Sequence, residues 1–360
     1  MDSIINIDPK HLISNGSSLN EIRFYKRIWI GYLHPPIVFV GLITNLMVLV
    51  ILPKMTNTLS NKSRFQYMCL AGFNFLTLMT FHFLQVFLGD GLFFASNGKF
   101  YFYLEKTGTI SCKLCWFSWF LCMALANYCY VEFCIERTIG VSAPLKAINI
   151  LTKKVRIMIW LTIVIVPSLF IALFAAYVKE ILINSRAVDG ITCGVPTSIG
   201  DMRIIYCIAA CFLIYIAHVV IMIFCNIVIL TKLHQASSSR LKLSKHFSSS
   251  SRKDTRTTMT LVVLSGIQVL LYLPAAFSCA AFCFVFFHEH DFRLKYYNEF
   301  VELNNSLGLF NAMTCISHSV NFFVYFFRMD AFRKEVLQML FLGSSTNSGT
   351  STWSSRIRVD

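Results

Sequence analysis

The chain has 360 residues, of which 56% are hydrophobic and only 14% are charged. A soluble domain usually carries about 25% charged residues, and one of this length could not bury so much apolar surface in its core. This composition excludes an ordinary soluble protein and favours one that is surrounded by lipid.

The apolar residues form long runs, and a run of about 18 or more is typical of a transmembrane helix. Seven runs qualify: Ile28–Leu52, Phe65–Leu88, Leu114–Ile135, Val155–Val178, Ile204–Leu230, Met259–Phe287 and Leu303–Phe327. The seventh is the weakest because it contains several Asn and a His, and without it both termini would share a side. The sequence predicts an all-α membrane protein, a seven-transmembrane helix bundle.

Charge orients the predicted bundle. With the N-terminus outside, the inner segments hold 20 of the 32 Lys and Arg but only 5 of the 18 acids. Such an excess of cations is expected on the cytoplasmic side. We therefore expect a multi-pass plasma-membrane protein with an extracellular N-terminus and a cytoplasmic C-terminus. The basic excess fits anionic lipid on the inner leaflet, not nucleic acid.

Four segments follow from this topology. Residues 1–27 form the extracellular N-terminus, with a glycosylation sequon at Asn15. Residues 28–327 form the transmembrane domain. Residues 328–342 have apolar positions at helical spacing and predict an amphipathic helix on the membrane surface. The Ser-rich residues 343–360 predict a disordered cytoplasmic tail.

Cysteine positions predict one disulfide. Of the 13 Cys, 11 lie in the apolar runs, and only Cys112 and Cys193 lie at or in outer segments. An oxidising exterior would pair these two. Two alternatives remain open: Cys115, one turn from Cys112, is the partner, or no bond forms.

Nearly every apolar run contains a short motif of its own. They are Thr44-Asn45-Leu46-Met47-Val48, Leu70-Ala71-Gly72-Phe73-Asn74, Cys112 with Glu136-Arg137-Thr138, Trp160 with Pro167, Leu271-Tyr272-Leu273-Pro274, and Ser319-Val320-Asn321-Phe322-Phe323-Val324-Tyr325. Each alone is weak. Together, in this order and spacing, they resemble the rhodopsin-like (class A) G-protein-coupled receptors from about Asn45 to Lys334. The Asn-Phe-x-x-Tyr motif is similar to that of invertebrate neuropeptide (FMRFamide-receptor-like) receptors.

The resemblance implies a receptor that carries an extracellular signal to a heterotrimeric G protein and to arrestin. It assigns G-protein coupling to Glu136 and Arg137, and switching to Asn321, Tyr325 and the hinge residue Pro274. Physically, Arg137 at the inner end of a span costs several kcal/mol unless it is paired or reaches water. Glu136 is its natural local partner, and plain snorkelling is the alternative.

Departures from the family pattern predict a polar core. Asn74 stands where the family has the acid that binds sodium, so we expect an amide network of Asn45, Asn74 and Asn321. Three further polar residues, Asn127, His218 and Gln268, align with an apolar contact set of the family.

Those three predict a second, hydrogen-bonded cluster that replaces apolar packing.

The ligand pocket is expected in the outer third of the bundle. Its predicted residues are Gln85, Trp116, Trp119, Tyr272 and Asn311. By the resemblance, retinal is excluded because the seventh run lacks a Lys, and biogenic amines because Trp119 stands in place of their Asp.

Acids of the flanking loops, Asp90, Glu299 and Glu302, suit a basic or amidated peptide. The alternatives are a chemosensory receptor for a small external molecule and, from another class, a seven-span channel or transporter. No nucleophile–base pair or phosphate loop is visible, so we expect no enzyme and no cofactor. We expect no metal site either, because the outer pair His288 and His290 reads as solvated.

Overall fold

The structure is a computed structural model that describes residues 24–56, 59–143, 152–183, 191–196, 202–242, 249–287 and 306–342. Several predicted features lie outside these ranges. They are the sequon at Asn15, the loop acids Glu299 and Glu302, the histidines His288 and His290, and the tail 343–360.

Within these ranges, seven helices are long and apolar enough to cross a membrane. We call them spans one to seven: Phe24–Lys54, Asn61–Ala95, Thr109–Ser142, Lys154–Val178, Ile204–Gln235, Thr258–Ala281 and Ser306–Arg328. The prediction of an all-α seven-helix bundle is confirmed, and the chain is a multi-pass membrane protein. Every predicted run overlaps one span.

Several spans combine α-helix with π-helical (η) segments or short 3-10 (η) turns. In chain order the elements are η1 Arg27–Leu33, α2 His34–Ile51, η2 Leu52–Lys54, α3 Asn61–Thr77, η3 Leu78–Gly91, α4 Leu92–Ala95, η4 Leu104–Lys106, α5 Thr109–Ser142, α7 Lys153–Ile159, η5 Trp160–Ile165, α8 Val166–Val178, β1 Glu180–Ile183, β2 Ile191–Gly194, α9 Met202–Ala210, η7 Cys211–Ile216, α10 Ala217–Lys242, α11 Ser249–Phe287, α14 Cys315–Ser319, α15 Asn321–Arg328 and α16 Asp330–Leu342.

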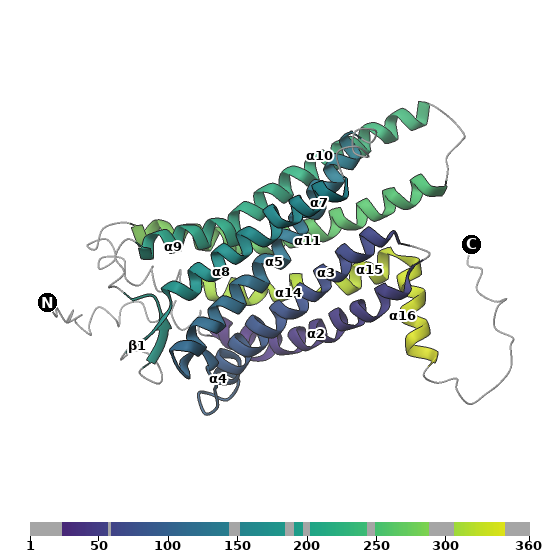
Figure 1. Cartoon of the computed structure of the whole chain (residues 1–360). Helices are drawn as coiled ribbons and strands as arrows, with labels where there is room; N and C mark the ends of the chain where they lie inside the picture. Colours follow the sequence, from purple (N-terminus) through teal and green to yellow (C-terminus); the bar gives the residue numbers. More distant parts are fainter. Residues whose placement is uncertain are drawn as a thin grey trace.

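The helices lie side by side along one long direction, with α5 inside the bundle (Figure 1). Helix α5 packs against α3, α8 and α10. The antiparallel hairpin of β1 and β2 lies at one end of the bundle (Figure 1). We call it the disulfide end, because β2 carries Cys193, which is bonded to Cys112. Helix α16 follows span seven at the opposite end, which we call the α16 end, so the two ends offer separate surfaces.

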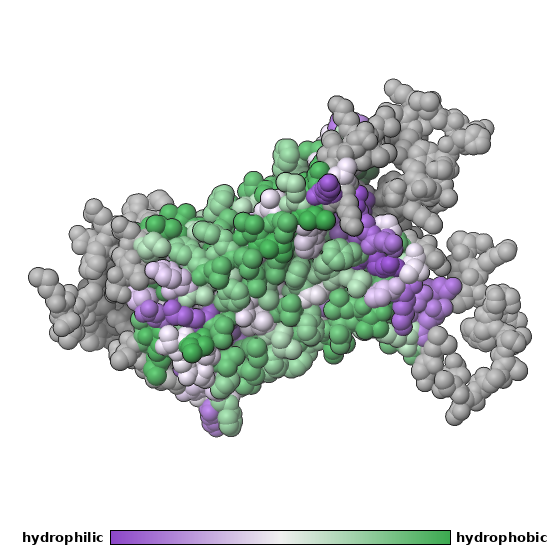
Figure 2. Space-filling model, viewed as in Figure 1, coloured by the Kyte–Doolittle hydropathy of each residue, from purple (hydrophilic) through white to green (hydrophobic). Residues whose placement is uncertain are grey.

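The outer surface of the bundle is apolar. Figure 2 shows hydrophobic residues along its length and hydrophilic residues toward the two ends. Large side chains such as Phe39, Leu173, Phe224 and Leu270 are exposed on the spans. A soluble protein rarely exposes contiguous apolar surface of this extent, so this surface fits the hydrocarbon of a bilayer.

Local sequence explains several helix boundaries. Ser60 caps α3 by accepting a hydrogen bond from the Ser63 backbone amide at 3.1 Å. Helix α11 continues through Pro274. Span seven is interrupted at Thr314 and at Val320, where the backbone ψ angles are −16° and −18°. Span seven contains no Pro, yet it is not one regular helix.

A disulfide joins Cys112, in the first turn of α5, to Cys193 on β2, with the Cα atoms 5.7 Å apart. The predicted pairing is confirmed, and Cys115 is a free thiol. Ile181 of β1 lies opposite Cys193 in the hairpin. The bond therefore fastens the segment between spans four and five onto the end of span three.

Replacing Cys112 or Cys193 by Ala is expected to lower the unfolding temperature of the purified chain. A disulfide that closes a loop of 81 residues stabilises by about 4 kcal/mol in the chain-entropy account. The double variant should be no less stable than either single variant, because all three lack the same bond. Cys69→Ala, at a free thiol, is the matched control. The prediction would be contradicted if the Cys112 and Cys193 variants lowered the unfolding temperature no more than this control does.

Candidate functional site

A cavity of about 440 Å³ opens at the disulfide end between spans one, three, five, six and seven. Aromatic, cationic and thiol side chains line it. The lining residues are Lys26, Trp116, Trp119, Phe120, Lys179, Val195, Tyr206, Cys207, Ala210, Tyr215, Cys279, Cys283, Leu307, Gly308 and Asn311. Its size is that of a pocket for a small ligand or for one end of a larger one.

Three of the five predicted pocket residues line this cavity: Trp116, Trp119 and Asn311. The other two do not. Gln85 donates a hydrogen bond to the Cys115 backbone carbonyl at 3.0 Å, which fixes span two to α5. Tyr272 is fully buried and bonds to a neighbouring span instead. Sequence position alone could not separate residues that line the cavity from residues that bond beside or beneath it.

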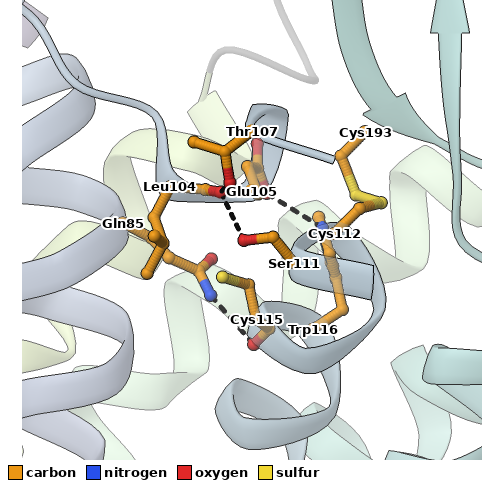
Figure 3. Close-up of a disulfide and its surroundings, with 9 residues drawn as sticks. All are labelled: Gln85, Leu104, Glu105, Thr107, Ser111, Cys112, Cys115, Trp116 and Cys193. Carbon is orange, nitrogen blue, oxygen red and sulfur yellow. Dashed lines mark hydrogen bonds between the residues drawn. A yellow bond between two sulfur atoms is a disulfide. The ribbon is translucent and has the colours of Figure 1, made fainter. Parts of the chain in front are cut away.

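Two lysines, Lys26 and Lys179, line the cavity and form what we call its basic wall, which the sequence did not predict. Lys179 follows span four, is only 7% exposed, and places its ammonium 3.3 Å from the centre of the Trp116 ring. Trp116 Nε1 donates to Glu105 Oε2 at 2.9 Å (Figure 3). The Lys179 ammonium therefore lies over the face of the Trp116 ring, and the Glu105 carboxylate binds the indole N–H at the edge of the same ring.

Burial controls the charges of this pair. It lowers the pKa of Lys179 to about 8, while the Glu105 carboxylate acts in the opposite direction. Burial likewise raises the pKa of Glu105, against the effect of Lys179. Lys179 is cationic below about pH 8. Asp90, expected among the loop acids that rim the pocket, lies in η3 of span two, is not among the residues that line this cavity, and accepts a hydrogen bond from the Tyr103 hydroxyl at 2.8 Å.

A buried histidine, His318 of α14, connects four spans beneath the cavity. Its Nδ1 lies 2.7 Å from Asn74 Oδ1, and its Nε2 lies 3.0 Å from the Tyr272 hydroxyl. Because an amide oxygen only accepts, Nδ1 carries the proton and Nε2 accepts from Tyr272. The His318 carbonyl accepts from Asn45 Nδ2 at 2.8 Å.

The expected amide network of Asn45, Asn74 and Asn321 is therefore built differently. His318 stands between Asn45 and Asn74, and Asn321 Oδ1 accepts from the Tyr130 hydroxyl at 2.7 Å. The composition of span seven indicates that it takes part in such a network, because a run with several Asn and a His needs hydrogen-bond partners inside the protein when lipid surrounds it.

The second predicted cluster forms in part. Gln268 Nε2 donates to Asn127 Oδ1 at 2.9 Å, joining spans six and three. His218 is fully buried but bonds to neither residue; its ring meets the edge of Tyr272, with centroids 4.9 Å apart. Neither ring nitrogen of His218 has a partner among the described residues.

At the α16 end, the expected pair of Glu136 with Arg137 is not formed. Glu136 pairs with Lys62 and, at 3.6 Å, with Arg156 Nε. Arg137 Nη2 instead donates to Ser63 Oγ at 3.2 Å. Consecutive residues of a helix point in different directions, so cations from spans two and four reach the carboxylate first.

A buried Gln ties two carboxylates together there. Gln66 Nε2 lies 2.6 Å from Glu136 Oε2 and 3.0 Å from Glu132 Oε2, so one amide holds both acids of span three. Tyr325 is buried nearby against Tyr67, with ring centroids 5.1 Å apart. Its hydroxyl has no partner among the described residues. Arg137 and Tyr325 thus lie at the same end, but no hydrogen bond or ion pair among the described residues joins them.

No protein-family profile matches the chain, and no curated protein is recognisably similar to it in sequence. Function must therefore be argued from the site itself.

His318→Leu should lower the unfolding temperature in detergent more than Tyr272→Phe does. The first change removes two buried hydrogen bonds, from His318 Nδ1 to Asn74 Oδ1 and from the Tyr272 hydroxyl to His318 Nε2, and the second removes only the latter. Each orphaned buried group costs roughly 1–3 kcal/mol. Tyr177→Phe, at an exposed tyrosine, is the control. Equal losses for the two core variants would contradict the role of His318.

Proposed function

We propose that the chain is a rhodopsin-like G-protein-coupled receptor, not an enzyme. In this proposal it lies in the plasma membrane with the disulfide end outside and the α16 end in the cytoplasm. A ligand enters the cavity, and the α16 end engages a heterotrimeric G protein and then arrestin. The observation that carries the proposal is the placement of two sites on one helix: α5 lines the cavity with Trp116 and Trp119 and carries Arg137 near its other end.

The buried polar contacts support a signalling role. His318, Tyr272, Gln268 and Asn127 lie beneath the cavity and bond between different spans. Each such bond depends on the relative position of two helices. A ligand that shifts one helix would therefore change a hydrogen bond that low dielectric makes strong.

Replacing Arg137 by Ala should abolish nucleotide exchange on the coupled G protein and leave surface expression largely intact. Lys99→Ala is the control, because Lys99 is exposed at the disulfide end, away from the surface proposed to engage the G protein. Exchange would be measured in membranes that contain a panel of G proteins, with and without a peptide pool. Full exchange by the Arg137 variant would refute this coupling role. Ion current without any G protein would favour the channel alternative.

The cavity favours a ligand with an acidic group, in contrast to the basic peptide that the loop acids alone suggested. Two Lys and no acid are among its described lining residues. Trp119 Nε1 is a buried donor with no partner among the described residues. A cation on an aromatic face and a free N–H suit a carboxylate, such as a peptide C-terminus or an acidic side chain. The ligand class in this proposal is an acidic peptide, with a small carboxylate compound as the chemosensory alternative.

Lys179→Gln should weaken the response to peptides with free C-terminal carboxylates by roughly tenfold or more, because a buried charge pair is lost. Lys179→Arg should retain most of the response. Lys99→Gln, an exposed Lys of the same end, is the control. The wild-type response should fall as pH rises through about 8, where Lys179 loses its proton. Stronger responses to the amidated versions of these peptides would contradict the acidic ligand class.

A further inference from the structure

Three buried cysteines converge where spans five and six meet. Cys211 begins η7, and Cys279 and Cys283 lie one turn apart on α11. Their sulfur atoms all lie within 4.8 Å of one another. The three residues are 4%, 7% and 7% exposed.

These thiols border the cavity. Cys279 and Cys283 are among its lining residues, as is Cys207 one turn before Cys211. Cys283 Sγ lies 3.5 Å from the Cys207 carbonyl oxygen, which directs it toward span five. A solute that enters the cavity therefore meets the thiol group directly, without crossing the apolar core.

Packing alone does not require this arrangement. A free Cys behaves in a core as a small apolar residue, and any small residue would serve that purpose. Three sulfurs from two helices instead form a donor set that suits soft d10 metal ions. Zn²⁺ binds thiolates in tetrahedral geometry, and a site with three protein ligands keeps the fourth position open.

We propose that Cys211, Cys279 and Cys283 bind one divalent soft d10 ion, Zn²⁺ in its biological form, with the fourth position facing the cavity. Binding releases the three thiol protons to water and involves no oxidation. Three thiolates around a divalent ion leave one net negative charge. Lys26 and Lys179 line the same cavity, and their cationic charge offsets it. This proposal is independent of the proposed receptor function.

The described residues contain a competing group, His34, His82 and Cys315. Its two histidines already bond to each other, with His34 Nε2 3.1 Å from His82 Nδ1. None of the three lines the cavity. This group offers a single sulfur, so the number of thiolates around the ion separates the two candidates.

The test is a titration of the full chain, purified without exposure to oxygen, with Cd²⁺ as the spectroscopic substitute for Zn²⁺. We expect one Cd²⁺ per chain, a sulfur-to-cadmium charge-transfer absorption with the intensity of three thiolates, release of about three protons, and displacement of previously bound Zn²⁺ by the softer Cd²⁺. Cys211→Ser, Cys279→Ser and Cys283→Ser should each weaken binding roughly tenfold or more. Cys225→Ser, at a buried thiol outside both groups, should bind like the wild type.

Several results would overturn the proposal. The first is a disulfide between spans five and six in protein taken directly from membranes. The second is an absorption of one-thiolate intensity that disappears in Cys315→Ser, because the ion would then occupy the competing group. The third is the absence of the absorption in the wild type. If the three Ser variants unfold, the wild type alone tests the proposal: an absorption of three-thiolate intensity with release of about three protons supports it, and lower values of both overturn it.

Discussion

The structure depends on one constraint: inside an apolar bundle, where no water is available, a polar group is stabilised by a partner within the protein. His318 meets this constraint for Asn45, Asn74 and Tyr272 at once, using its carbonyl and both ring nitrogens. Those three residues lie on spans one, two and six, so one residue of span seven fixes the relation of four helices. The same constraint explains Gln66, whose amide lies between two carboxylates that would otherwise repel each other.

The sequence predicts the seven spans well because the physical signal is simple. A helix in lipid must be apolar over its whole length, and no competing fold exposes such runs. The disulfide was predictable for a related reason, since only Cys112 and Cys193 lie at or in the segments that the charge pattern places outside. The apolar runs do not predict where each span is α-helical, π-helical or interrupted. Span seven is interrupted at Val320, where no Pro or Gly is present to predict it.

The candidate site was less predictable because its contacts join residues distant in sequence. Motif positions placed Trp116, Trp119 and Asn311 at the cavity. They could not reveal Lys179, whose role depends on the disulfide that positions the hairpin beside α5. Glu136 shows the same limit. Its sequence neighbour Arg137 was the expected partner, but Lys62 and Arg156 converge on it from spans two and four. Adjacency along a helix gives no contact, whereas packing between helices does.

The basic wall and the thiol group border one cavity from different spans, and this shared space has a thermodynamic consequence. An ion bound by Cys279 and Cys283 would present its open position to the volume that an acidic ligand occupies. A carboxylate is itself a ligand for Zn²⁺. If the ligand bridges Lys179 and the ion, each strengthens the binding of the other by the same factor, because coupling between two sites is reciprocal. If the ligand fills the cavity without reaching the ion, net repulsion from the thiolates makes the coupling negative. The sign of this coupling therefore reports where in the cavity the carboxylate lies.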